Sequence, residues 1–243
     1  MPTFLNRYLN GEYEQVWDEL YAEGKAIQQE PLLGDALAVT GETMRRVRNN
    51  IELIIHHLHA LGYKFGTYPD GRTKIPEYSG PFHPPKANIS NELAKLELLE
   101  GVGLLPLSLK VFWENVGDVD FMGYHPLWPE YSDPLVVYPI EVAKYEYKDW
   151  RYFVKERDME AGRFGIPLAP DYYHKDNVSG GDSYKIYTPN GAIDGIFENE
   201  RLETTFVNYL RISFRHGGFP GVQWHKGIIP KELSELSEGL IPI

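Results

Sequence analysis

The chain contains no cysteine among its 243 residues. This absence excludes a disulfide framework, thiolate catalysis and any zinc or iron–sulfur site held by cysteine. No run of about 18 apolar residues occurs, so the sequence predicts no membrane-spanning helix. The first residues also lack the basic and apolar regions of an export signal. We therefore expect a cytoplasmic protein that has no membrane partner.

Positive charge is scarce. The sequence has 24 Lys and Arg against 35 Asp and Glu, which gives a net charge of −11. The densest basic cluster, Arg45, Arg46 and Arg48, is interleaved with Glu42 and Glu52. Proteins that bind nucleic-acid backbones need clustered Lys and Arg, so we expect no nucleic-acid partner. An acidic surface favours solubility, and it also favours association with a basic protein.

The common signatures of enzymes are missing as well. Ser179 lacks the first glycine of a nucleophile elbow, and the glycine-rich residues 217–221 are interrupted by proline and precede no Gly-Lys-Ser/Thr sequence. We expect no catalytic residue and no cofactor. A small hydrolase of unrecognised type remains the alternative.

Three histidines near the end of an expected helix, His56, His57 and His59, form the best metal candidate. Together with Glu52 they could share a face and offer ligands to zinc or iron. Their spacing is not His-Glu-x-x-His, however, and the helix dipole alone favours histidine at a C-terminal end. We expect no metal, with a metal-dependent enzyme as the alternative.

Residues 105–123, LPLSLKVFWENVGDVDFMG, are the most informative segment. Pro106 suits the first turn of a helix, and Gly117 suits its end. The apolar residues between them fall at i, i+3, i+4 and i+7, which predicts one buried stripe: Leu109, Phe112, Trp113 and Val116. Val119 and Phe121 then alternate with Asp118 and Asp120, which predicts a half-buried strand.

Residues 1–65 predict an N-terminal helical hairpin. Val16, Trp17 and Leu20 form a stripe on the first helix. A longer helix should begin near Asp35, a suitable N-cap, and end at Gly62. Residues 66–90 are rich in proline and predict a connecting segment, which could be a linker or a strap across one compact fold. Because the helical part before it is short, we favour the strap.

Residues 91–243 mix helices and strands. Residues 134–139 predict a strand near a sheet edge because prolines bound it, and residues 141–157 predict a helix. Three more strands are expected at residues 164–168, 183–188 and 192–198. Asn190-Gly191 predicts a hairpin between the last two. The fold class is therefore α+β: a small antiparallel sheet flanked by helices and preceded by the helical hairpin.

This order resembles the SUKH superfamily over roughly residues 91–220. The Leu-Pro helix, the meander of strands and a closing helix of the form TTFVNYLRISF, which begins at Thr204 or Thr205, carry the resemblance. It implies an α+β domain that binds proteins and does not catalyse a reaction. Relatives of this kind serve as immunity proteins that neutralise toxins, so the resemblance implies a protein partner, with a basic toxin as one such partner. A structural assembly subunit is a further alternative.

Aromatic residues are plentiful, with 17 Tyr and 5 Trp. Tyr and Trp are the usual anchors of protein interfaces. We expect the partner-binding residues among those in loops and at helix ends: Trp128, Trp150, Tyr172 and Tyr173, with Asp171 beside them.

Overall fold

The computed structural model describes residues 3–128, 130, 132–156, 162–227 and 229–243. Helices and small antiparallel sheets make up an α+β fold with an N-terminal helical region, as the sequence predicts. The described helices are α1 (Phe4–Leu9), α2 (Tyr13–Ala22), the 3₁₀ helix η1 (Gly24–Gln28), α3 (Leu32–Ala60), α4 (Ile89–Glu97), α5 (Leu107–Asn115), α6 (Ile140–Glu156), α7 (Tyr172–Lys175), α8 (Phe206–Arg215), the 3₁₀ helix η2 (Pro220–Trp224) and α9 (Lys231–Glu235). The described strands are β1 (Lys64–Phe65), β2 (Phe82–His83), β3 (Asp118–Asp120), β4 (Gly123–Tyr124), β5 (Val136–Val137), β6 (Gly165–Ala169) and β7 (Tyr184–Tyr187).

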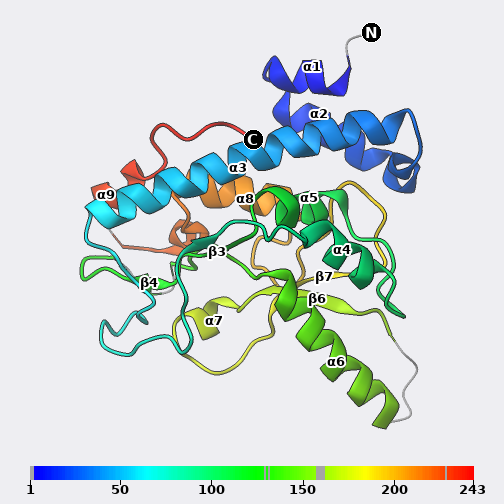
Figure 1. Cartoon of the computed structure of the whole chain (residues 1–243). Helices are drawn as coiled ribbons and strands as arrows, with labels where there is room; N and C mark the ends of the chain where they lie inside the picture. Colours follow the sequence, from blue (N-terminus) through cyan, green and yellow to red (C-terminus); the bar gives the residue numbers. More distant parts are fainter. Residues whose placement is uncertain (1–2, 129, 131, 157–161, 228) are drawn as a thin grey trace.

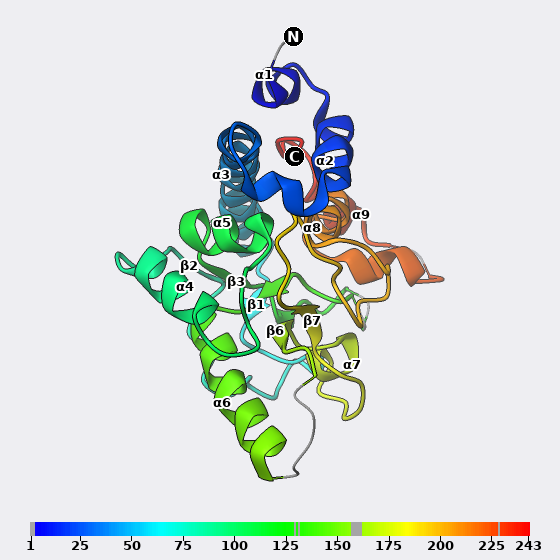
Figure 2. The ribbon, with the colours of Figure 1, turned by 90° about the vertical axis from the view of Figure 1, so that its right-hand side faces the viewer.

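Helix α3 crosses the upper half of the molecule in Figure 1, with α1 and α2 above one end of it and α5 and α8 beneath it. The apolar side chains of α3 are buried on one face, including Val39, Met44, Val47, Ile51 and Ile54. The small sheets lie below α5, and α6 extends away from the body at the opposite end (Figures 1 and 2). The described helices include none that is long and apolar enough to cross a membrane.

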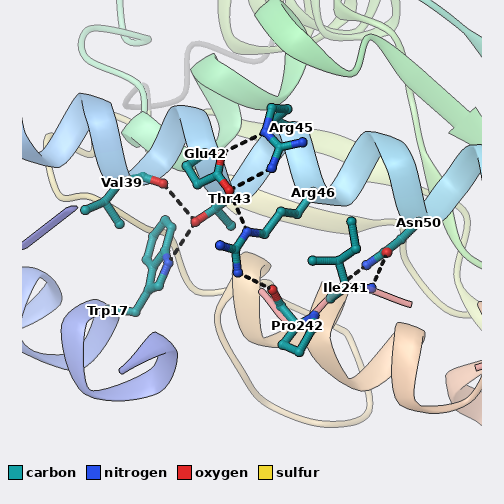
Figure 3. Close-up of polar contacts among 9 residues, drawn as sticks. All are labelled: Trp17, Val39, Glu42, Thr43, Arg45, Arg46, Asn50, Ile241 and Pro242. Atoms are coloured by element: carbon teal, nitrogen blue, oxygen red, sulfur yellow. Dashed lines mark hydrogen bonds and ion pairs between the residues drawn. The ribbon is translucent and has the colours of Figure 1, made fainter. Parts of the chain in front are cut away.

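Polar side chains on α3 hold the C-terminal segment of the chain (Figure 3). Arg46 pairs with Glu42 at 2.7 Å and donates to the carbonyl of Pro242 at 2.9 Å. Asn50 donates to the carbonyl of Ile241 and accepts from its amide. Because buried polar groups need partners, these bonds fix the C-terminal segment along α3.

Helix α5 follows the phase that the sequence predicts. Leu109, Phe112, Trp113 and Val116 are at most 1 % exposed. Pro106 precedes the first turn as its N-cap residue. Gly117 has a φ of 96°, and a Cβ there would lie 2.2 Å from a carbonyl oxygen of β2, so a side chain cannot fit at this position.

The strands of the described residues form three small antiparallel sheets. The three-stranded sheet has the order β2–β3–β5, so β5 lies at an edge, as predicted. The two-stranded sheets pair β1 with β4 and β6 with β7. The proline-rich residues 66–90 include β2, which pairs with β3, so this segment is part of the three-stranded sheet.

The structure corrects two local predictions. Helix α3 begins at Leu32, and Asp35 instead accepts hydrogen bonds from the first amides of α1, Phe4 and Leu5. Asn190-Gly191 forms no tight two-residue hairpin turn, because its backbone bonds distant residues: the Asn190 amide donates to the Leu104 carbonyl, and the Gly191 carbonyl accepts from the Gln28 side chain. Residues 192–198 form no continuous strand. They meet β7 at one isolated antiparallel bridge, between Lys185 and Glu198, whereas β7 pairs along its length with β6.

Candidate functional site: an acidic groove

An open groove of about 1100 Å³ lies beside the three-stranded sheet. Its walls come from the proline-rich segment before β2, the strands β3 and β5, the start of α6, and α7 with the loop after it. Five carboxylates line it, namely Glu77, Asp118, Asp120, Glu141 and Asp171. Three tyrosines line it as well: Tyr68, Tyr78 and Tyr138.

Strand β3 places two of these carboxylates. Its side chains alternate, so Val119 is 1 % exposed in the core while Asp118 and Asp120 reach the groove from the other face. The same alternation that predicts the strand therefore determines which face of the sheet is acidic.

Asp118 forms an ion pair with a histidine on the neighbouring strand. The register of β2 and β3 sets His83 opposite Asp118, and the His83 Nδ1 lies 2.8 Å from the Asp118 carboxylate. This hydrogen bond raises the pKa of His83 above its usual range. Burial raises the pKa of Asp118, and the bond to His83 opposes that shift.

Asp120 has a different environment. Its Oδ1 accepts a hydrogen bond from the Met122 amide at 2.9 Å, and no side-chain cation within the described ranges forms an ion pair with it. Burial raises the pKa of its carboxyl to about 6. Desolvation without a paired cation explains this direction, because burial penalises the charged form.

The short helix α7 supplies the opposite wall. Asp171 is its N-cap and accepts hydrogen bonds from the Tyr173 and His174 amides. The Asp171 carboxylate also contacts the His174 ring, which forms a second Asp–His pair in the groove. Gly181 lies so close that a Cβ there would be 2.6 Å from the Asp171 carboxyl carbon. The loop after α7 thus covers this carboxylate, which is only 3 % exposed.

A buried ion pair anchors α7 to the core. Lys175 and Asp133 have side chains that are 0 % exposed, and the Lys175 Nζ lies 2.5 Å from the Asp133 carboxylate. The hydroxyl of Tyr184, on β7, donates to the same carboxylate at 3.1 Å. The position of Asp171 and His174 in the groove therefore depends on a contact beneath them.

The balance of charge in the groove favours a cationic ligand. Among the residues that the structure describes, Lys86 is the one lysine in its lining, and it already pairs with Glu141 at 2.6 Å. The two Asp–His pairs also provide groups that could transfer protons. Within the described residues no group of three or more metal-ligating side chains is arranged to hold an ion, and this applies to His56, His57 and His59.

The predicted partner-binding residues lie in different places. Asp171, Tyr172 and Tyr173 are together at the start of α7, where the two tyrosine rings lie 4.0 Å apart. Asp171 is buried and reaches the groove, Tyr172 is covered in part by Arg201 at 4.6 Å, and Tyr173 is 39 % exposed.

The two tryptophans belong to separate ring clusters. Trp128 is half-buried and packs against Tyr63 and Phe219, with ring centroids 5.1 and 5.3 Å away. Trp150 is half-buried on α6 and packs against Phe164 at 5.3 Å. Neither lines the groove, so of the five predicted residues only Asp171 belongs to its lining.

Sequence reasoning missed most of the groove. The sequence predicts Asp118 and Asp120 as the polar positions of a strand, and their spacing of two residues is the available signal for a shared acidic face. No local pattern pointed to Tyr78, Tyr138 or His83, because their contacts join segments far apart in the sequence. Comparison of the chain with family models, curated proteins and solved structures finds no match.

Proposed function

We propose that this protein binds another protein without catalysing a reaction, and that the acidic groove receives a basic segment of the partner. The observation that carries the proposal is the lining: among the described residues, five carboxylates and three tyrosines line one open groove of about 1100 Å³, with Asp171 the most covered of the carboxylates. This volume exceeds the roughly 300–1,000 Å³ typical of small-molecule pockets. Tyrosine rings beside carboxylates suit the long, partly apolar side chains of arginine and lysine.

The charge of the whole chain supports the same partner chemistry. A net charge of −11 attracts a basic protein at long range and repels an acidic one. The resemblance to SUKH domains adds an immunity-type role, in which an acidic protein neutralises a basic toxin. Complementary potentials would speed the capture of such a toxin and fix its orientation.

Charge reversal at the rim of the groove tests the proposal. Glu77 and Glu141 line the rim, and a Glu77→Lys/Glu141→Lys variant should weaken a salt-sensitive partner complex at least about tenfold. The matched control is Asp149→Lys/Glu156→Lys, which makes the same change of charge on exposed residues of α6 outside the groove. The partner would be captured with the full chain from the host and its affinity then measured by calorimetry at several salt concentrations.

The two variants separate groove binding from a general charge effect. Loss of affinity in the groove variant alone supports the proposal. Equal losses in both variants, or an affinity that does not change with salt, would refute binding in the groove, since screening acts over about 10 Å at 0.1 M salt.

An acid–base enzyme is the second candidate function. The observation that favours it is the presence of two Asp–His pairs, His83 with Asp118 and His174 with Asp171, in one groove. Turnover of a small substrate that requires both imidazoles would favour this function over binding alone.

A further inference from the structure

The floor of the groove combines one carboxylate with two aromatic rings. Asp120 lies between strands β2 and β5 on the central strand of the sheet, and Tyr78 and Tyr138 line the groove with it. The Tyr78 hydroxyl donates to the Asp120 carbonyl at 2.8 Å, which holds the ring beside this residue. Burial is the main cause that raises the pKa of both tyrosines, and the negative charge of Asp120 is the second. Both hydroxyl groups are therefore close enough to Asp120 to interact with its charge.

Asp120 and Glu77 are the two groove carboxylates for which no ion pair occurs within the described residues, and Asp120 differs from Glu77 because it is half-buried whereas Glu77 is exposed. Asp118 contacts His83, Asp171 contacts His174, and Glu141 contacts Lys86. Asp120 receives a backbone amide on one oxygen only, and none of the ion pairs within the described residues includes it. A desolvated carboxylate of this kind gains most from a ligand that brings positive charge.

The protein already uses the same combination for one of its own arginines. Arg46 pairs with Glu42 at 2.7 Å, and its guanidinium lies 4.9 Å from the Tyr8 ring and 5.0 Å from the Tyr13 ring. One carboxylate and two tyrosines thus enclose a guanidinium, and Arg46 is only 7 % exposed. The set of Asp120, Tyr78 and Tyr138 has the same chemical composition but opens to the groove.

We propose that Asp120, Tyr78 and Tyr138 form a subsite for one arginine side chain of the partner. This inference rests on the proposed function and names the group that the groove recognises. Arginine fits better than lysine because its planar guanidinium stacks on aromatic rings and bonds a carboxylate through two N–H groups. The remaining carboxylates of the rim then attract the basic segment without selecting a particular side chain.

Peptide probes test the subsite with the full chain. The probe is an acetylated, amidated peptide that alternates glycine with three arginines, and its neutral control replaces each arginine by citrulline. A third peptide carries lysine in place of arginine. We expect the arginine peptide to bind more tightly than the lysine peptide, and the citrulline peptide to show no binding by calorimetry at low salt.

Substitution of Asp120 is the decisive variant. Asp120→Asn keeps the shape of the side chain and should reduce affinity for the arginine peptide about tenfold or more, because hydrogen bonds to charged groups are the stronger class. Asp149→Asn, an exposed carboxylate on α6 outside the groove, makes the same change of charge and should leave affinity within about twofold. Tyr78→Phe keeps the ring and should retain binding, while Tyr78→Leu should lose about threefold. Thermal midpoints of all variants establish that they remain folded.

The outcomes distinguish the subsite from the proposed function. If Glu77→Lys/Glu141→Lys abolishes peptide binding but Asp120→Asn does not change it, the groove binds basic segments and the arginine subsite is wrong. Equal binding of the arginine and lysine peptides would also overturn the subsite while leaving the groove function intact. If the arginine peptide does not bind the unmodified protein at low salt, both the subsite and the groove function are wrong.

Discussion

Replacement of Lys175 by methionine should destabilise the protein strongly. The Lys175 side chain is fully buried, pairs with the fully buried Asp133, and lies over the Tyr184 ring with its Nζ 4.8 Å from the centroid. Lys175→Met fills nearly the same volume, so the chief change is the loss of the positive charge. Among the described residues, the Asp133 side chain then keeps the Tyr184 hydroxyl as its one hydrogen-bond partner. Breaking a buried ion pair on one side costs about 3–5 kcal/mol, because the remaining charge stays desolvated.

This loss is large compared with a typical unfolding free energy of about 5–15 kcal/mol. For a chain of this size it should lower the thermal midpoint by about 6–20 °C. Denaturant unfolding followed by circular dichroism measures the free energy, and the slope of the transition shows whether unfolding remains two-state.

Two further variants separate the charge from the packing. Adding Asp133→Asn to Lys175→Met removes the unpaired charge and should recover most of the lost free energy, since asparagine also tolerates the φ of 50° found at this position. Lys231→Met breaks a surface ion pair on α9 and should leave the midpoint unchanged. A loss below about 1 kcal/mol in Lys175→Met, or a double variant no more stable than the single one, would refute the buried-charge explanation.

Two other predictions concern stability. Trp113→Ala removes a ring that is 1 % exposed and its hydrogen bond to the Tyr138 carbonyl. It should lower the free energy of unfolding, measured with denaturant, by about 3–5 kcal/mol. A loss below about 1 kcal/mol would mean that the ring is not in the core. Glu200 is 3 % exposed, and burial raises its pKa from 4.5 to about 7. The folded state therefore holds a proton that the unfolded state has released between these values, and stability should fall as pH rises through this window. Glu200→Gln should remove that fall in stability. The stability of this variant relative to the unmodified protein should therefore increase from pH 4.5 to about 7. Melting curves at pH 5 and pH 8 that show no such increase would contradict the assignment.

Local patterns in the sequence determine the main elements. The stripe from Leu109 to Val116 predicts both α5 and its buried face, because a helix brings positions three and four apart onto one side. The alternation around Val119 predicts β3 in the same way, and Gly117 ends the helix because a left-handed backbone costs glycine little. These features need no knowledge of distant residues.

Local sequence patterns do not predict which of several possible hydrogen-bond partners a residue contacts. Asp35 has the chemistry of an N-cap, but it caps α1, which packs against α3 from an earlier part of the chain. Asn190-Gly191 has the composition of a hairpin turn, but Leu104 and Gln28 bond its backbone. A side chain or an amide bonds the partner that tertiary packing brings nearest, and sequence proximity does not decide which partner that is.

The composition, the net charge of −11 and the elements around Trp113 and Val119 are thus determined by the sequence itself. Only the tertiary structure decides that Asp120, Tyr78 and Tyr138 share one groove, and that Trp128 and Trp150 pack elsewhere. Hydrophobic periodicity relates residues a few positions apart, whereas the groove is lined by segments that are far apart in the sequence. The desolvation that raises the pKa of Asp120 to about 6 arises only when those segments meet.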